Sequence, residues 1–268
     1  MQKISFEKLK KLSEFGADLR EVHKESSNIF ILDLKKGEAF NIKNWDFLVH
    51  IAVLKGSARA SFENKEETLK QGCLASILPD TTVKIDAVED LRMLMIKDNP
   101  LWILLERRSV RKFSSKPVPR EIIEKIFEVA RFAPSAGNIQ PWRVYVTNRE
   151  EVKEELYNAS FRQEHLLEAS WIAVITAVPE ESAGKYEERG RNLYALQDAS
   201  AFTTYALLSA KAYGIDSCWI GDFDEDRVWK IIGSPEGQRP VAIIALGYGE
   251  ENPEAPYRKS LNRFLSFI

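Results

Sequence analysis

The chain has 268 residues, of which 44% are hydrophobic, so it is long enough to bury a sizeable core in one or two domains. Its 38 Lys and Arg nearly balance 40 Asp and Glu, and the formal net charge of -2 excludes a broad electrostatic footprint for nucleic acid. The two cysteines, Cys73 and Cys218, have neither CxxC nor Cys/His spacing, which argues against a disulfide framework or a zinc site.

Residues 1–15 place apolar and charged residues at helical spacing and contain no secretory apolar core. No stretch of the chain reaches the run of about 18 apolar residues that a transmembrane helix needs. We therefore expect a cytoplasmic protein that binds no nucleic acid and inserts into no membrane.

The first part of the chain predicts an all-β domain, because short apolar runs at 29–34, 47–54, 74–78 and 91–96 alternate with turn signals. Residues 53–96 resemble the second half of a cupin barrel, in which a strand ends in a Lys-Gly turn and a later Gly and Pro bracket the next strand. Metal-binding cupins carry a histidine cluster, whereas this region has His50 alone, and one imidazole cannot hold a metal ion. We predict a cupin-like β-barrel domain at 1–97 without metal ligands. Its role stays open: it could bind a small effector, contribute to assembly of the protein, or shield the second domain.

A change of composition at Asp98-Asn99-Pro100 marks the predicted start of a second domain at 98–268. Pro119 is expected to begin a helix whose inner positions are Ile122, Ile126, Val129 and Ala133. Strands are expected at 142–147, 171–178 and 241–249, and the last two are apolar on both faces, as in a sheet covered by helices. Between them, 199–210 carries no charge and predicts a helix that is buried within the chain or at a dimer interface.

A cluster of basic residues follows the domain boundary, in the sequence LLERRSVRKF. Arg107, Arg108 and Arg111 lie beside Ser109. Guanidinium groups with a neutral hydroxyl suit a phosphate monoester, although a solvated helix end gives the same pattern.

A polar turn follows the predicted helix, in the sequence PSAGNIQPW. Asn138 and Gln140 each carry a donor and an acceptor on one side chain, so they can bind a ring edge that presents both. The helix would end before Pro134 so that this turn can face a ligand.

The order RRSVRKF, then PSAGNIQPW, resembles the FMN-dependent nitroreductase family. CWIGDFDEDRVWKIIG at 218–233 and RPVAIIALGYGEENPEAPYRKSL at 239–261 extend the resemblance over roughly 101–268. It implies an α+β nitroreductase-like fold, with a central mixed sheet flanked by helices, in a homodimer with the flavin at the interface. The whole chain would then join this fold to a smaller N-terminal all-β cupin-like barrel.

The resemblance also implies the site. Arg107, Ser109 and Arg111 would hold the phosphate and ribityl chain with Arg258. Pro256 stands where many relatives have a basic residue, so either fewer basic groups hold the phosphate or Arg108 compensates. The turn would come from the partner subunit, and Ile220 with Gly221 would pass the ring near N5 and O4. The residues expected to bind FMN are Arg107, Arg108, Ser109, Arg111, Pro134, Ser135, Ala136, Asn138, Gln140, Ile220, Gly221 and Arg258.

The activity that the resemblance implies is ping-pong transfer of two electrons from NAD(P)H, through flavin N5, to an oxidised organic acceptor such as a nitro compound or a quinone. We nominate no catalytic side chain, because the cofactor supplies the chemistry. His165 is interpreted as a surface or hydrogen-bonded histidine. Two alternatives stay open. One is a dehalogenase or flavin-fragmenting member of the family, although the sequence of the expected lid at 180–193 matches the pattern of neither. The other is a flavin-binding sensor with little turnover.

Overall fold

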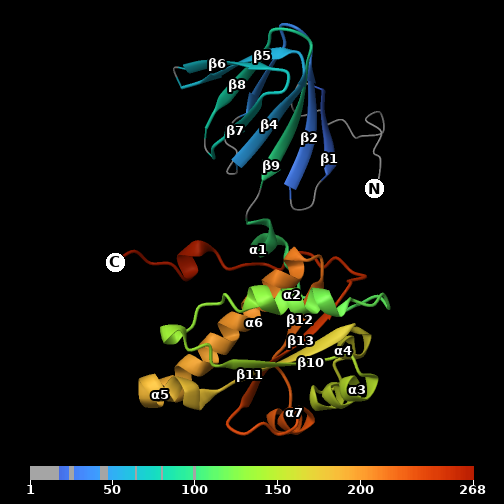
Figure 1. Ribbon diagram of the computed structural model, residues 1–268, viewed down its shortest axis with the longest axis vertical. Helices are drawn as coiled ribbons and strands as arrows, with labels where there is room; N and C mark the ends of the chain where they lie inside the picture. Colours follow the sequence, from blue (N-terminus) through green and yellow to red (C-terminus); the bar gives the residue numbers. More distant parts are fainter. Residues whose placement is uncertain (1–17, 24–26, 43–47, 64, 80, 99–100) are drawn as a thin grey trace. The chain divides into compact units, whose positions relative to one another are not determined.

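The chain divides into two compact units, unit 1 (Met1–Trp102) and unit 2 (Ile103–Ile268), each with its own core (Figure 1). The computed structural model describes residues 18–23, 27–42, 48–63, 65–79, 81–98 and 101–268. The helical spacing expected at 1–15 and the boundary residues 99–100 lie outside these ranges.

Unit 1 consists of two antiparallel sheets that share one apolar core. The first, in the order β1-β2-β9-β4-β7, contains β1 (Asp18–His23), β2 (Ser27–Leu34), β9 (Leu91–Asp98), β4 (Leu48–Lys55) and β7 (Leu74–Ile77). The second, in the order β3-β8-β5-β6, contains β3 (Ala39–Ile42), β8 (Val83–Ala87), β5 (Ser57–Phe62) and β6 (Lys65–Lys70). Alternate side chains, such as Ile51, Ile85 and Met93, are buried between the sheets. The predicted strands are confirmed, whereas the likeness to a cupin stays a prediction.

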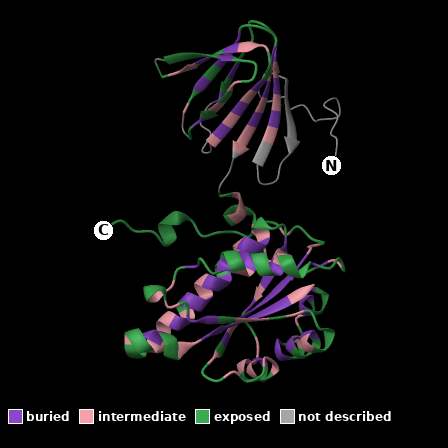
Figure 2. Cartoon of the chain, in the orientation of Figure 1, coloured by how far each residue is buried: buried purple, intermediate pink, exposed green. Residues whose placement is uncertain are grey.

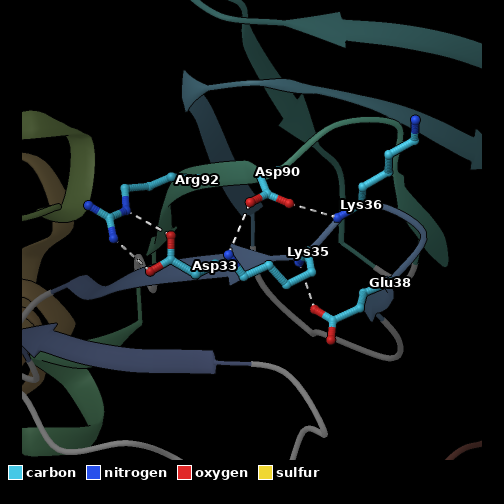
Figure 3. A network of polar contacts seen from close by, with 6 residues as sticks. All are labelled: Asp33, Lys35, Lys36, Glu38, Asp90 and Arg92. Carbon is cyan, nitrogen blue, oxygen red and sulfur yellow. Dashed lines mark hydrogen bonds and ion pairs between the residues drawn. The ribbon is translucent and has the colours of Figure 1, made fainter.

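A polar network joins two turns at one end of unit 1 (Figure 3). Asp90, between β8 and β9, accepts hydrogen bonds from Lys35 Nζ at 3.0 Å and from the Lys36 amide at 3.1 Å. Across the β2–β9 pair, Arg92 donates to both oxygens of Asp33, at 2.7 and 2.9 Å. These contacts tie the β2–β3 turn to the β8–β9 turn and hold the register of the strands between them.

His50 is a paired strand histidine, since its Nδ1 lies 2.9 Å from Ser76 Oγ on the neighbouring strand. Among the described residues, no three His, Cys, Asp or Glu side chains gather as a metal site would require. Cys73 and Cys218 are both free thiols.

Unit 2 contains a four-stranded sheet in the order β10-β11-β13-β12. Its strands are β10 (Trp142–Thr147), β11 (Trp171–Ala177), β13 (Arg239–Gly247) and β12 (Asp216–Ile220), which confirms the three predicted strands and adds β12. We expected a mixed sheet. The described pairings between these strands are all antiparallel, and parallel pairing is confined to an isolated bridge between Ser109 and Ser217.

Helices cover both faces of this sheet, so β11, β13 and β12 are buried along most of their length, whereas the edge strand β10 is buried only at Trp142 (Figure 2). On one face lie α2 (Arg120–Ala130) and α6 (Ala195–Ala212), and on the other lie α3 (Glu150–Ala159), α4 (His165–Glu168) and α7 (Glu225–Ile231). The remaining elements are α1 (Trp102–Glu106), η3 (Ala136–Asn138), α5 (Pro179–Arg189), η4 (Gly190–Tyr194) and η5 (Leu261–Arg263). Within the described residues, no helix combines the length and apolar character needed to cross a membrane.

The inner face of α2 differs from the prediction. Ile123, Ile126 and Ala130 are buried, whereas the predicted Val129 is 42% exposed and Ile122 is only partly buried. Two apolar stripes overlap at Ile126, and packing against α6 selects the stripe that contains Ile123 and Ala130.

Candidate functional site

The segment after α1 is held between two parts of the unit 2 sheet. The Val110 amide donates to the Ser217 carbonyl of β12 at 3.1 Å, next to the parallel bridge at Ser109. Further along, the Ser114 amide donates to the Tyr248 carbonyl at 2.8 Å, just after β13. Val110 is buried, so the backbone that carries Arg107 and Arg111 is fixed here. The Arg108 guanidinium folds back on this segment and donates to the Leu105 carbonyl at 2.5 Å and to the Arg107 carbonyl at 3.0 Å.

The arginines of this segment form a cationic cluster with a residue far along the chain. Burial, followed by the positive charges of Arg108 and Arg258, lowers the pKa of Arg107. Arg107 and Arg108 are half-buried, whereas Arg111 and Arg258 are exposed. None of these four guanidinium groups forms an ion pair with any residue in the described part of the chain. Like charges gathered without an ion-paired carboxylate favour an anion as the missing partner of the site.

The turn after α2 is ordered by its own polar groups. The Gln140 amide donates to Ser135 Oγ at 3.0 Å, and Gln140 Nε2 donates to Asn138 Oδ1 at 3.2 Å. Gly137, Asn138 and Gln140 all have φ near 57°, in the left-handed region. Asn138 and Gln140 are not glycine, so this conformation strains their backbone. Strain of this kind persists where the surrounding structure holds polar side chains in one arrangement.

A buried carboxylate fixes this turn to the core. Asp198 on α6 is 7% exposed and accepts the Ala136 amide with both oxygens, at 3.1 and 3.2 Å. Burial raises the pKa of Asp198, and the hydrogen bond from Ala136 opposes that rise. The remaining predicted turn residue, Pro134, is exposed at the end of α2.

Ile220 and Gly221 lie at the end of β12. Ile220 is 2% exposed and belongs to the core, and Gly221 is exposed with no atom closer than 3.8 Å to the position of an added Cβ. The β12 strand therefore carries the Ser109 bridge near its start and an open backbone position just past its end.

The predicted residues fall into two groups within one chain. Arg107, Arg108, Ser109, Arg111 and Arg258 gather beside β12, and Ser135, Ala136, Asn138 and Gln140 gather in the turn on α6. Among the described residues, no hydrogen bond or ion pair joins the first group to the second.

Comparison with known proteins places unit 2 in a family. The profile of the nitroreductase family matches residues 104–165 and 159–248, which include the turn and all of the first group except Arg258. The chain belongs to the nitroreductase family. It is 31% identical over 186 residues to the NADH dehydrogenase of Thermus thermophilus, a match that covers 59% of this chain and 91% of the relative.

Solved nitroreductase-type structures share the fold of unit 2. A Staphylococcus epidermidis protein assigned as an NAD(P)H:FMN oxidoreductase is 26% identical with a TM-score of 0.56, and the match covers 62% of this chain and 94% of that one. The NADPH:FMN oxidoreductase of Vibrio harveyi is 22% identical with a TM-score of 0.57, covering 62% and 75%.

In this nitroreductase-family chain, several residues near the site were missed by the sequence analysis. Asp198 is one, and its only signal was a carboxylate at the edge of an uncharged helical run. Glu251 is another, since its Oε1 accepts the Arg111 amide at 2.5 Å. Lys185 is a third, and it lies over the turn together with Tyr186, which the sequence analysis did consider as a pocket residue. Lys185 Nζ and Tyr186 Oη are each 2.6 Å from where a Cβ on Gly137 would sit.

The expected lid at 180–193 is built as α5 and η4. Glu187, inside α5, has φ 50° and ψ −137°, and the π-helix of η4 follows directly. Gly190 is required there, since an added Cβ would lie 2.3 Å from the Ser182 carbonyl oxygen. Arg191 pairs with both oxygens of Glu180, at 2.7 and 2.9 Å, which closes the segment on itself.

The interpretation of His165 was wrong. The side chain is only 6% exposed, and its Nε2 has no hydrogen-bond partner among the described residues. Burial, followed by the charge of Arg111, lowers the pKa of His165, while Glu168 and Glu251 act in the opposite direction. Helical periodicity does not reveal that α4 turns this position into the core.

Proposed function

We propose that the protein is an NAD(P)H-dependent oxidoreductase that carries FMN and acts on a small oxidised acceptor, a nitro compound or a quinone, by a ping-pong mechanism. The observation that carries this proposal is the cluster of Arg107, Arg108 and Arg258, which fits a terminal phosphate and has no ion-pair partner in the described part of the chain. Within that part, the Arg108 side chain donates only to the carbonyls of Leu105 and Arg107. Family membership and the names of the relatives, among them an NADH dehydrogenase and an NADPH:FMN oxidoreductase, support the cofactor and the electron donor.

The residues of this chain would bind and orient the cofactor. Arg107, Arg108, Arg111 and Arg258 would neutralise the phosphate, with Ser109 as a neutral donor. Ser135, Asn138 and Gln140 would place donors and acceptors along the ring edge, and the exposed backbone at Gly221, directly after the buried Ile220, would approach it closely. When bound, FMN supplies the two-electron chemistry that links NAD(P)H to the acceptor, so no side chain of the protein needs to act as an acid or base.

We further propose that the active form is a homodimer in which Pro134, Ser135, Ala136 and Asn138 complete the partner's site. The sheet order supports this arrangement, because the turn leads into β10 at one edge of the sheet and the segment with Ser109 is bridged to β12 at the other. So does the extended segment after β13, where Tyr257, Phe264 and Phe267 are 87%, 69% and 94% exposed. On α6, Thr204 and Tyr205 are also exposed, opposite the face packed on the sheet.

In this proposal, residues 98–268 form the flavin-binding domain and residues 1–97 a separate β domain. A flavin-binding sensor is the second candidate, and the presence of unit 1 favours it. One experiment separates the two functions. An enzyme should oxidise NADH or NADPH with menadione or nitrofurazone much faster than free FMN does, whereas a sensor should bind FMN and show no such acceleration.

The cofactor itself is tested by denaturing purified protein and identifying the released flavin by chromatography. We expect FMN, because the cluster suits a single terminal phosphate. Recovery of FAD, or a colourless protein that does not bind added FMN, contradicts the proposal.

A further inference from the structure

Unit 1 contains a cavity that the flavin chemistry does not use. It has a volume of ≈ 500 Å³ and is lined by residues of β4, β5, β6, β7 and β8 and of the turns between them. This volume lies within the range of about 300–1,000 Å³ that is usual for small-molecule sites.

The inner wall of the cavity is the apolar core of the sandwich. Ile51, Ala60, Leu69 and Ile77 line it and are each no more than 7% exposed. Leu78, which also lines it, is 66% exposed. An apolar wall that continues to an exposed leucine can bind the carbon skeleton of a ligand.

One of the residues that line the cavity, Glu67, is exposed to solvent and carries a carboxylate. Glu67 on β6 pairs with Ala60 on β5 and lies two residues before Leu69, so its side chain is on the core face of the strand. Its neighbour Glu66 pairs with Ser61 on the opposite face, where it lies 3.7 Å from Arg59 Nε.

The charge of Glu67 is not balanced by the protein. Within the part of the chain that the structure describes, Glu67 forms no ion pair and no side-chain hydrogen bond. Lys65 shares its strand face but is neither a lining residue nor an ion-pair partner. The only other charged residue among the described lining positions is Glu63, a second carboxylate, so the cavity favours a cation.

We propose that this cavity binds a small organic cation, an amine with an apolar aromatic or aliphatic skeleton, with its ammonium group on Glu67. The skeleton would cover the apolar wall, and the charge-assisted hydrogen bond would select amines over acids and alcohols of the same shape. The proposal does not depend on the identity of the cofactor in unit 2.

The test uses the full-length chain saturated with FMN and three probes of matched shape: 2-phenylethylamine, 2-phenylethanol and 3-phenylpropanoate. Affinity is measured by ligand-observed NMR titration. We expect the amine to bind most tightly, and Glu67→Gln to weaken it by about tenfold, the scale of one charge-assisted contact. Glu66→Gln is the matched control, since it removes the same charge from the other face, and should change affinity by about twofold or less.

A second variant tests the location. Ala75→Phe places a ring in the cavity lining and should abolish binding of the amine while its bound FMN is unchanged. If this variant fails to fold, as judged by circular dichroism, the Glu67→Gln and Glu66→Gln pair still decides. The proposal is overturned if the amine does not bind, if the alcohol or the acid binds as tightly, if the two glutamine variants behave alike, or if folded Ala75→Phe binds the amine normally.

Discussion

Both carboxylate oxygens of Asp198 accept the backbone amide of Ala136, at 3.1 and 3.2 Å. This hydrogen bond links the polar turn 135–140 to α6, and the Asp198 side chain that accepts it is buried. The carboxylate therefore acts as a positioning group for the turn.

We predict that Asp198→Ala weakens FMN binding by about tenfold, because the partly buried Ala136 amide loses its acceptor and an unmet donor costs about 1–3 kcal/mol. Asp198→Asn keeps one acceptor oxygen, so its FMN affinity should lie between those of Asp198→Ala and wild type. FMN affinity is measured by fluorescence titration. Ser200→Ala is the control, since Ser200 Oγ donates only within α6, to Leu196. Equal affinities in Asp198→Ala and Ser200→Ala would show that the turn does not need this anchor.

Arg107 and Arg258 are predicted to share one phosphate from positions 151 residues apart in the sequence. Changing either to Ala should lower FMN affinity by roughly ten- to over a hundredfold, the scale of one charge-assisted contact. In the double variant, the loss of FMN binding free energy should be smaller than the sum of the two single losses, because groups that bind one phosphate are coupled.

Riboflavin and Arg263 provide the controls for that prediction. Riboflavin lacks the phosphate and should bind wild type and both variants equally, and Arg263→Ala should leave FMN affinity unchanged. Unchanged FMN affinity in both single variants, or an equal loss for riboflavin, would contradict the assignment of the clamp.

Gly137 offers a test of the contact between the turn and the lid. Its φ is 57°, and an added Cβ would lie 2.6 Å from Lys185 Nζ and Tyr186 Oη, the ends of two flexible side chains. Gly137→Ala should cost about 1 kcal/mol, or roughly 2 to 4 °C in Tm, because a non-glycine residue is strained there. Displacing the two side chains should also change KM for the acceptor severalfold.

The control for Gly137 lies on the lid itself. Gly184, in α5, has nothing within 4 Å of an added Cβ, so Gly184→Ala should be neutral or slightly stabilising, by up to about 1 kcal/mol. Thermal unfolding and steady-state kinetics are measured on both variants. Matching Tm and KM values for the two would mean that the lid does not rest on the turn.

Local patterns in the sequence predicted the strands better than the contacts between distant segments. The run at 142–147 corresponds to β10 because its bounds are set by Pro141 and by the polar residues that follow. The inner face of α2 was missed because Ile122 and Ile123 both fit a helical stripe, and only the packing on α6 chooses between them. Asp198 and Ala136 are 62 residues apart, so no local pattern reveals their hydrogen bond.

The basic cluster was recognised from composition, but its link to Arg258 came from the family resemblance. Spacing along the chain cannot indicate that a residue after β13 returns to the segment before α2. The backbone contacts at Ser114–Tyr248 and at Lys112–Glu250 bring these two segments side by side, and they depend on the order of strands in the sheet.

The last prediction concerns His165 and the dependence of stability on pH. Its pKa in the folded protein lies below the usual value of 6.5, chiefly because burial penalises the charged ring. The unfolded chain therefore takes up the proton first as pH falls below 6.5, and the folded state loses stability relative to it, with a slope of at most about 1.4 kcal/mol per pH unit. His165→Phe cannot titrate, so the difference in unfolding free energy between wild type and this variant should shrink, or shift in favour of the variant, between pH 7.5 and pH 5.

Urea unfolding at several pH values measures this difference. Tryptophan emission reports mainly on unit 2, which contains Trp142, Trp171, Trp219 and Trp229. His50→Gln is the control, because His50 belongs to unit 1 and its replacement should leave the unit 2 transition unchanged at every pH. If the unfolding free energies of wild type and His165→Phe change in parallel across this pH range, the ring is protonated equally easily in the folded and unfolded states. The buried Nε2 without a hydrogen-bond partner would then have no consequence for the pH dependence of stability.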